Sequence, residues 1–313
     1  MAITLLQEAL MYSVYFAPRG RKRLLNLGHQ ISQRYLSPLD NLIGVIGDAG
    51  AGKSVFIKGM FPGLELTNDD EGINVRPLPL LDGVDNGFFS SHTYHIDVRF
   101  ESAFTQMYLL AEAVKTALEH NKRVIVEHFD LLYPYLKMNA QIIIGIGEEV
   151  IVTRPSIFGP CPKDIADIVY KSIKYRKMAH TAEDFTGLVL EKELGFEHCE
   201  GHNDIRHGFV LEFDNKPDID IEDLEKRTKN LINKNLDICY VDDNHISIGD
   251  TKFECTGPRI HLKNSSEIEH FKLIKEYKYN PITKSYALIG TIGIDYDISI
   301  NELNSLKYHM YVK

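Results

Sequence analysis

The sequence predicts two domains: an α/β domain with a mostly parallel sheet in three layers, followed by an α+β domain with an antiparallel sheet. The chain has 313 residues, and at about 100–200 residues per domain this length suggests two domains. The first half alternates short apolar runs with helical patterns, which is typical of layered α/β domains. The second half alternates apolar and polar residues over several short stretches, which indicates antiparallel strands.

The composition excludes several classes of protein. Hydrophobic residues make up 44% of the chain and charged residues 25%, which are ordinary globular values and argue against a disordered chain, a collagen-like fibre or a disulfide-rich miniprotein. Lys and Arg number 35 against 44 Asp and Glu, a net charge of -9. Nucleic acid is therefore a disfavoured partner by default, because phosphate affinity comes mainly from Lys and Arg.

The cysteines and the N-terminus point to a cytoplasmic protein. The 4 cysteines are scattered and form no C-x-x-C pair, which favours a reduced compartment. The N-terminus lacks a basic region followed by an uninterrupted apolar core, so we expect no signal peptide. No stretch reaches the roughly 18–20 apolar residues that a bilayer crossing requires, and we expect no membrane association.

Elements of the first half can be assigned in order. Residues 1–40 are expected to be a helical segment, with one amphipathic helix over 3–16 and another over 21–35. The α/β domain, residues 41–175, follows. Continuous apolar runs predict strands buried on both faces of its sheet, at 41–46, 94–98, 123–127, 141–146 and 150–153. Helical patterns between these strands lie at 54–60, 101–120 and 131–136.

One motif carries specific chemistry. Between the first apolar run and the first helix, the chain matches the P-loop pattern G-x-x-x-x-G-K-[ST] in full with Gly47, Asp48, Ala49, Gly50, Ala51, Gly52, Lys53 and Ser54. Glycines let the main chain approach phosphates, and successive N–H groups at a helix N-terminus favour an anion. Lys53 is expected to bridge the β- and γ-phosphates and Ser54 to hold Mg²⁺. The motif therefore predicts ATP or GTP with Mg²⁺ as ligand.

Carboxylates and arginines at strand ends are the next candidates. Glu127 is our first choice for the magnesium-side or base carboxylate, and Asp130 is the second, with the alternative that Asp130 caps the following helix. Asp97 is the candidate base on the acceptor side, since an acceptor hydroxyl must lose a proton as it attacks. Arg99 and Arg154 follow predicted strands, and each either stabilises phosphate charge or forms surface ion pairs.

The second domain is placed at residues 176–313. A helix is expected to run from Lys163 towards Lys177, and a strongly charged helix over 221–236. Alternating patterns predict strands at 209–213, 237–241, 245–249, 259–263, 271–277 and 285–290.

Three stretches of this domain resemble the editing region of alanyl-tRNA synthetases and their free-standing relatives. Residues 178–195 begin Met178-Ala179-His180-Thr181-Ala182 and look like the family's H-T-A-x-H helix with its trailing Leu-Gly. Residues 208–214 are similar to its strand with a terminal Phe-Asp. Residues 255–268 look like its C-G-G-x-H motif and the Ser-Glu-Ile that follows. The resemblance covers a little over a third of the chain.

The resemblance implies a zinc site. Carried over by position, the ligands are His180, Asp184, Cys255 and His261. This chain departs from the family at two points: Asp184 stands where the family has a second histidine, and five residues rather than three separate Cys255 from His261. A nearby group either adds ligands or is a polar loop: His198, Cys199, His202 and His207.

These observations leave three functional hypotheses. The first is an ATP-dependent phosphotransferase or NTPase whose editing-like domain recognises the acceptor, with Lys53 and Ser54 on the phosphates and Mg²⁺ and with Asp97 or Glu127 as base. The second, implied by the resemblance, is a trans-editing aminoacyl-tRNA deacylase with a regulatory nucleotide-binding domain, although the acidic charge disfavours tRNA. The third is a non-catalytic, nucleotide-responsive binding switch.

Overall fold

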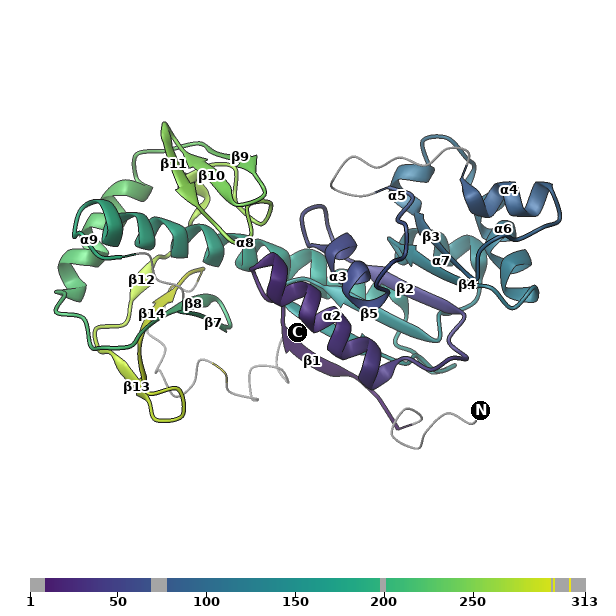
Figure 1. Ribbon diagram of the computed structural model, residues 1–313, viewed down its shortest axis with the longest axis horizontal. Coiled ribbons are helices and arrows are strands. Elements are labelled where there is room, and N and C mark those ends of the chain that lie inside the picture. Colours follow the sequence, from purple (N-terminus) through teal and green to yellow (C-terminus); the bar gives the residue numbers. More distant parts are fainter. Residues whose placement is uncertain (1–8, 69–77, 198–200, 294, 296–303, 305–313) are drawn as a thin grey trace. The chain divides into compact units, whose positions relative to one another are not determined.

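The structure, a computed structural model, describes the chain except for residues 1–8, 69–77, 198–200, 294, 296–303 and 305–313 (Figure 1). The chain divides into two compact units. The first unit combines the described residues up to Ala17 with Arg21–Ile173, and the second joins Pro18–Gly20 to the described residues from Lys174 onward. The tripeptide Pro18–Gly20 therefore belongs to the second unit although both of its neighbours in sequence belong to the first.

A six-stranded mixed sheet forms the centre of the first unit, in the order β1-β6-β5-β2-β4-β3. Its strands are β1 Ser13–Phe16, β2 Leu42–Ile46, β3 Thr93–Asp97, β4 Arg123–Glu127, β5 Ile142–Ile146 and β6 Glu149–Thr153. Strands β5, β2, β4 and β3 run parallel, whereas β6 pairs antiparallel with both β5 and β1. The predicted α/β domain with a mostly parallel sheet is confirmed.

Helices pack on both faces of this sheet. They are α2 Arg21–Tyr35, α3 Lys53–Met60, α4 Pro79–Asp85, α5 Val98–Glu101, α6 Met107–Glu119, α7 Phe129–Leu136 and α8 Pro162–Lys192. Ile43, Val45 and Ile125 share one buried cluster with α2 and α3. Val124 and Val126 point the other way and share a second cluster with α6 and α7. Because successive strand side chains alternate between faces, apolar runs such as 123–127 supply both clusters, and three layers result.

Two expectations for the first unit need correction. Within the predicted helix 3–16, Ser13–Phe16 form strand β1, which pairs antiparallel with β6, and residues 1–8 lie outside the described part. The predicted helix 101–120 begins only at Met107, because the chain turns after α5 and leaves Phe104 63% exposed. The helix predicted over 21–35 is confirmed as α2.

The second unit contains two antiparallel sheets against the C-terminal part of α8. One has the order β11-β10-β9, and the other β12-β14-β8-β7 with β13 beside β14. The elements are β7 Gly201–Ile205, β8 Gly208–Phe213, α9 Ile221–Ile232, β9 Ile238–Asp242, β10 His245–Ile248, β11 Thr251–Glu254, η1 Ser265–Glu267, β12 Lys272–Leu273, β13 Lys278–Asn280 and β14 Ser285–Thr291. Phe185 of α8, Leu211 of β8 and Leu224 of α9 share its core. The antiparallel strands predicted at 209–213, 237–241, 245–249 and 285–290 are confirmed.

Other expectations for the second unit need correction. The helix expected to run towards Lys177 continues to Lys192 as the single helix α8. Residues 259–263 follow a turn and then run irregularly instead of forming a strand: Ile260 donates its backbone N–H to the Gly257 carbonyl at 3.0 Å, and Leu262 donates its own to the Thr181 hydroxyl at 3.1 Å. Within 271–277 only Lys272–Leu273 pair as a strand.

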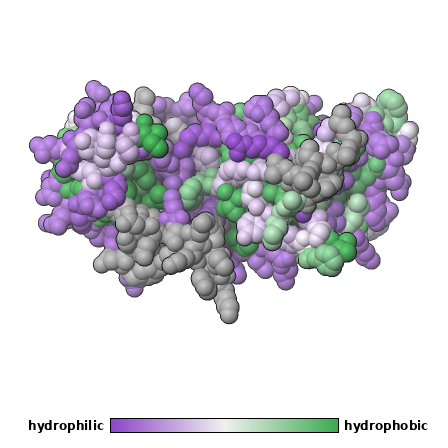
Figure 2. Space-filling model, turned by 90° about the horizontal axis from the view of Figure 1, so that it is seen from below, coloured by the Kyte–Doolittle hydropathy of each residue, from purple (hydrophilic) through white to green (hydrophobic). Residues whose placement is uncertain are grey.

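Among the described residues, no helix has the length and apolar character to span a bilayer. The face of the molecule in Figure 2 is largely hydrophilic, with smaller hydrophobic areas between the polar ones.

Candidate functional site

The Gly47–Ser54 loop connects β2 to α3 and requires glycine at defined positions. Gly50 and Gly52 have φ angles of 76° and 84°, in the left-handed region that favours glycine. A Cβ on Gly52 would lie 2.4 Å from the Leu24 side chain of α2. Gly52 is also the N-cap of α3, so the loop ends directly on the helix N-terminus.

The loop and the first turn of α3 leave several amides available. The Ala51 N–H donates to the Asp48 carbonyl at 3.1 Å, and the first N–H bonded within the helix is that of Phe56, to Gly52 O at 2.9 Å. In the part of the chain that the structure describes, the N–H groups of Gly50, Gly52, Lys53 and Ser54 have no acceptor. Such a run of unpaired amides at a helix N-terminus attracts anions.

Glu127 lies beside the two side chains that end the loop. The carboxyl ends of parallel strands share one edge of a sheet, so Glu127 at the end of β4 lies near the loop after β2. The Ser54 hydroxyl donates to Glu127 Oε1 at 3.4 Å, and Lys53 Nζ lies 3.7 Å from Oε2. Lys53 also donates to the Asp48 carbonyl, 3.2 Å away. The predicted residues Lys53, Ser54 and Glu127 are thus brought together.

His95, which the sequence analysis missed, holds Glu127 in place. The Thr67 N–H donates to His95 Nδ1 at 3.2 Å, which leaves the ring proton on Nε2 to donate to Glu127 Oε1 at 3.1 Å. Burial raises the pKa of Glu127, but the His95 hydrogen bond and the Lys53 charge outweigh it and bring the pKa below its ordinary value. The available signal was a histidine inside the buried strand β3.

Lys53, Ser54 and Glu127 line a cavity of about 270 Å³. Its other lining residues include Asp97, Arg99 and His128. Asp97 caps α5 by accepting the Phe100 N–H at 3.1 Å, and its other oxygen accepts the Asn68 amide at 3.1 Å. Arg99 lies 3.4 Å from the Asp48 carboxylate of the loop. Asp97 and Arg99 therefore line the same cavity as Lys53, Ser54 and Glu127.

His128 joins β4 to α7 and is the N-cap of that helix, with a φ of 55°. Burial, followed by the nearby Lys53 charge, lowers the pKa of His128 to about 4.

Two other candidates have structural partners. Asp130 follows the N-cap position of α7 and accepts a hydrogen bond from the Tyr170 hydroxyl at 3.2 Å, so its expected capping role is corrected. Arg154 forms a buried ion pair with Asp40, 2.6 Å away.

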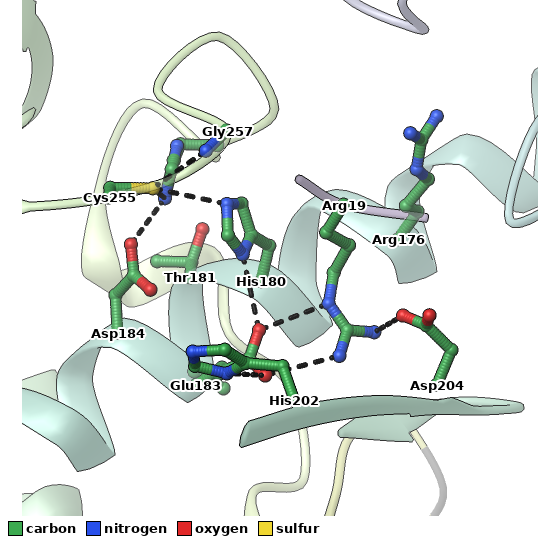
Figure 3. Close-up of polar contacts among 12 residues, drawn as sticks. Arg19, Arg176, His180, Thr181, Glu183, Asp184, His202, Asp204, Cys255 and Gly257 are labelled. Carbon is green, nitrogen blue, oxygen red and sulfur yellow. Dashed lines mark hydrogen bonds and ion pairs between the residues drawn. The ribbon is translucent and has the colours of Figure 1, made fainter. Parts of the chain in front are cut away.

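In the second unit, His180, Asp184, Cys255 and His261 form a group that can hold a metal ion, here called the donor cluster (Figure 3). Their donor atoms all lie within 4.8 Å of one another. Cys255 Sγ is 3.2 Å from His180 Nε2 and 3.8 Å from His261 Nε2, which is 2.9 Å from Asp184 Oδ2. Tetrahedral zinc with bonds of about 2.0–2.3 Å separates its ligand atoms by about 3.3–3.8 Å, and the separations within the donor cluster lie on both sides of that range, from 2.9 Å to at most 4.8 Å.

Each of the two histidines forms a hydrogen bond through Nδ1, the ring nitrogen that faces away from the donor cluster, as histidines that bind a metal usually do. His180 Nδ1 lies 3.2 Å from Glu183 Oε2, and His261 Nδ1 lies 3.2 Å from the Pro258 carbonyl. Because both partners are acceptors, each Nδ1 carries its proton and each Nε2 turns a lone pair into the donor cluster. Burial lowers the pKa of His180, which favours the neutral imidazole that a metal needs. With Nδ1 protonated, His261 Nε2 and the Asp184 carboxylate direct lone pairs at one centre, where a metal ion could be held.

The two described histidines of the neighbouring group, His202 and His207, lie in and just after strand β7. His202 lies on strand β7, and its Nδ1 is 3.0 Å from Glu183 Oε1. His207, at the turn between β7 and β8, packs against the Tyr175 ring with centroids 4.0 Å apart. His198 and Cys199 lie outside the described residues.

Comparisons with known proteins place the chain in no family: no protein-family model matches it, and no curated protein does either. The geometry of the two sites therefore carries the functional argument.

Proposed function

We propose that the first unit binds a nucleoside triphosphate with Mg²⁺ and transfers or hydrolyses its γ-phosphoryl group. One observation carries this proposal: Lys53, Ser54 and Glu127 converge beside a glycine loop that presents unpaired amides at a helix N-terminus. Amides and an ammonium group suit the charge of phosphate oxygens, and a hydroxyl beside a carboxylate suits a hard cation. The P-loop motif in the sequence points to the same ligand.

In this mechanism the chain supplies position and charge. The unpaired amides within Gly50–Ser54 and the Lys53 side chain hold the β- and γ-phosphates, while the Ser54 hydroxyl and Glu127 form the magnesium side of the site. Mg²⁺, when bound, neutralises charge on the phosphate oxygens. Arg99, exposed at the cavity, adds a second cation for the transferring group. His95 keeps the Glu127 carboxylate oriented through the bond to Oε1.

Of the two candidate bases, Asp97 and Glu127, we assign Asp97 to accept the acceptor's proton. Each of its oxygens accepts one hydrogen bond from the protein, and a carboxylate offers about four acceptor positions. An acceptor hydroxyl, or a water in an NTPase, can therefore still donate to Asp97. The Asn68 and Phe100 bonds fix the direction from which it does so.

Labelled nucleotide tests this proposal. We expect the purified chain to release ³²P from γ-labelled ATP or GTP, or to transfer it to a compound from a metabolite pool. Lys53→Met is expected to abolish this, whereas Lys115→Met, which removes a partly exposed lysine on α6 that pairs with Glu112, is not. Nucleotide binding without release or transfer would favour the binding switch. Undiminished turnover in Lys53→Met would refute the assignment.

We further propose that the donor cluster holds Zn²⁺, as the resemblance to the synthetase editing region implies. The mixed nitrogen, oxygen and sulfur donors and the two oriented imidazoles support zinc. Zn²⁺, when bound, supplies Lewis-acid chemistry suited to ester hydrolysis. The trans-editing deacylase is therefore the second candidate function.

Metal analysis and a deacylation assay test this second candidate. We expect about one zinc per chain, lost in Cys255→Ala and kept in Cys239→Ala, which alters an exposed cysteine. Release of alanine or serine from mischarged tRNA, abolished by Cys255→Ala, would support the deacylase. A zinc-free preparation that is fully folded and does not take up added Zn²⁺ would remove the zinc proposal.

A further inference from the structure

Arg19 is buried in the second unit although it lies between two elements of the first. Its guanidinium donates through Nε and Nη2 to the two oxygens of Glu183, at 3.1 and 3.3 Å. It also donates to the carbonyls of Asn203 and Gly208 and pairs with Asp204 at 3.1 Å. Its side chain is 4% exposed, and Figure 3 shows it directed at Glu183 and Asp204.

Glu183 links this arginine to the donor cluster. Glu183 Oε2 accepts from Arg19 Nε and also lies 3.2 Å from His180 Nδ1. Nδ1 is the nitrogen of the His180 ring that faces away from the donor cluster. The other oxygen of Glu183 lies 3.0 Å from His202. Glu183 is adjacent in sequence to Asp184, and both carboxylates are buried. Two adjacent buried carboxylates need a compensating cation, and Arg19 supplies it for Glu183.

The backbone around Arg19 also lies against the cluster. A Cβ on Gly257 would lie 2.2 Å from the Arg19 carbonyl oxygen and 3.0 Å from His180 Nε2. The Gly257 N–H donates to Cys255 Sγ at 3.3 Å. Arg176 of α8 donates to the Pro18 carbonyl at 2.6 Å, which fixes the tripeptide on the same helix that carries His180 and Asp184.

We propose that Arg19 is a positioning residue of the metal site: through Glu183 it fixes the ring and the tautomer of His180, so that metal affinity depends on the Pro18–Gly20 tripeptide. This inference rests on the proposed metal site and goes beyond it, because the segment that completes the site comes from 164 positions before Glu183. Partners that orient a ligating histidine change metal affinity by about 10–100-fold when they are removed.

Full-length variants test the inference by competition of Zn²⁺ with a chromophoric chelator and by the absorption spectrum of the Co²⁺-loaded chain. Arg19→Gln is expected to lower the affinity for Zn²⁺ by about 10–100-fold and to change the Co²⁺ bands. Arg19→Lys is expected to recover part of the affinity, since it restores the charge but not the two-pronged contact. Arg227→Gln is the control, because Arg227 pairs with Asp223 and Glu193 on the surface.

Unchanged Zn²⁺ affinity and an unchanged Co²⁺ spectrum in Arg19→Gln would overturn the proposal. If that variant does not fold, the double variant Arg19→Gln, Glu183→Gln removes the charge pair as a whole. Wild-type affinity in the double variant would overturn the proposal as well, and weakened affinity would support it. Failure of the wild-type chain to bind Zn²⁺ or Co²⁺ would instead refute the metal site itself, so the two failures are distinguishable.

Discussion

Glu127 is the residue on which the proposed nucleotide site depends. Its carboxylate receives the Ser54 hydroxyl and the His95 ring N–H on one oxygen and faces Lys53 with the other. It is 2% exposed, so its charge persists only because these partners compensate for lost hydration. Removal of a partner should therefore affect both stability and turnover.

His95→Asn tests this residue-scale argument. The shorter amide cannot bridge Thr67 and Glu127 as the imidazole does, so a buried carboxylate loses a donor. We expect the free energy of unfolding to fall by about 1–3 kcal/mol and turnover to fall with it. Denaturant unfolding and the labelled-nucleotide assay measure the two effects. His92→Asn, at an exposed histidine just before β3, serves as control, and equal behaviour of both variants would contradict the role given to His95.

The sequence predicts the candidate residues that belong to a local motif or end a strand. It does not predict those whose part in a site depends on a partner far away in the sequence. Lys53 and Ser54 were predictable because the glycine pattern fixes their place relative to a strand and a helix. Glu127 was predictable because it ends an apolar strand. His95 bonds to Glu127, 32 positions away, and Arg19 bonds to Glu183, 164 positions away. No spacing rule connects residues that only the tertiary fold brings together.

At the scale of elements, close approach of α2 to α3 shapes the loop. Cβ atoms on Gly28 and Gly59 would lie 2.4 and 2.1 Å from the carbonyl oxygens of Phe56 and Leu25. Each of these two helices therefore relies on a glycine where it meets the backbone of the other. Leu24, in the first turns of α2, packs where a Gly52 side chain would project.

Gly52→Ala is expected to disrupt the site at this scale. The added methyl group meets Leu24, and φ of 84° is strained for alanine. We expect nucleotide affinity to fall at least tenfold, measured by calorimetric titration. Adding Leu24→Ala should recover only part of it, because that change relieves the contact and not the backbone strain. Gly63→Ala, a position with similar φ and open space around it, is the matched control.

Gly257→Ala is expected to disturb the donor cluster in the same way, through a steric clash in the turn after β11. Its methyl group would meet the backbone carbonyl of Arg19, which has little freedom to move, and approach His180. We expect weaker Zn²⁺ binding in the chelator competition with little change in nucleotide affinity. Wild-type Zn²⁺ affinity in this variant would contradict the packing of the Pro18–Gly20 tripeptide against the donor cluster.

Element prediction succeeded where burial on both faces produces a continuous apolar run, as in β2, β4 and β5. It failed for β1, a four-residue edge strand whose pairing with β6 decides its conformation. It failed again at 259–263, where buried Ile260 and Leu262 alternate as in a strand. There, hydrogen bonds to Gly257 and Thr181 hold the backbone in a turn and an irregular stretch, and the pattern alone does not reveal this.

The whole molecule has two units with separate buried cores. A ligand that binds only the folded form stabilises it by about 2.7 kcal/mol at 100 times its Kd. We therefore expect Mg·ATP to stabilise chiefly the first unit and Zn²⁺ chiefly the second. Hydrogen exchange resolved by peptide measures this: protection should rise in β2, α3 and β4 with nucleotide and in the C-terminal part of α8 with zinc. Identical protection patterns for both ligands would contradict the assignment.

The central claim, that the Gly47–Ser54 loop grips a triphosphate, is tested most directly by calorimetric titration of the full chain with Mg·ATP and Mg·GTP. The account predicts one nucleotide per wild-type chain and per Lys115→Met chain, and no measurable binding to Lys53→Met. Equal binding by the wild-type and Lys53→Met chains, or no binding of either nucleotide by the folded wild-type chain, would contradict it.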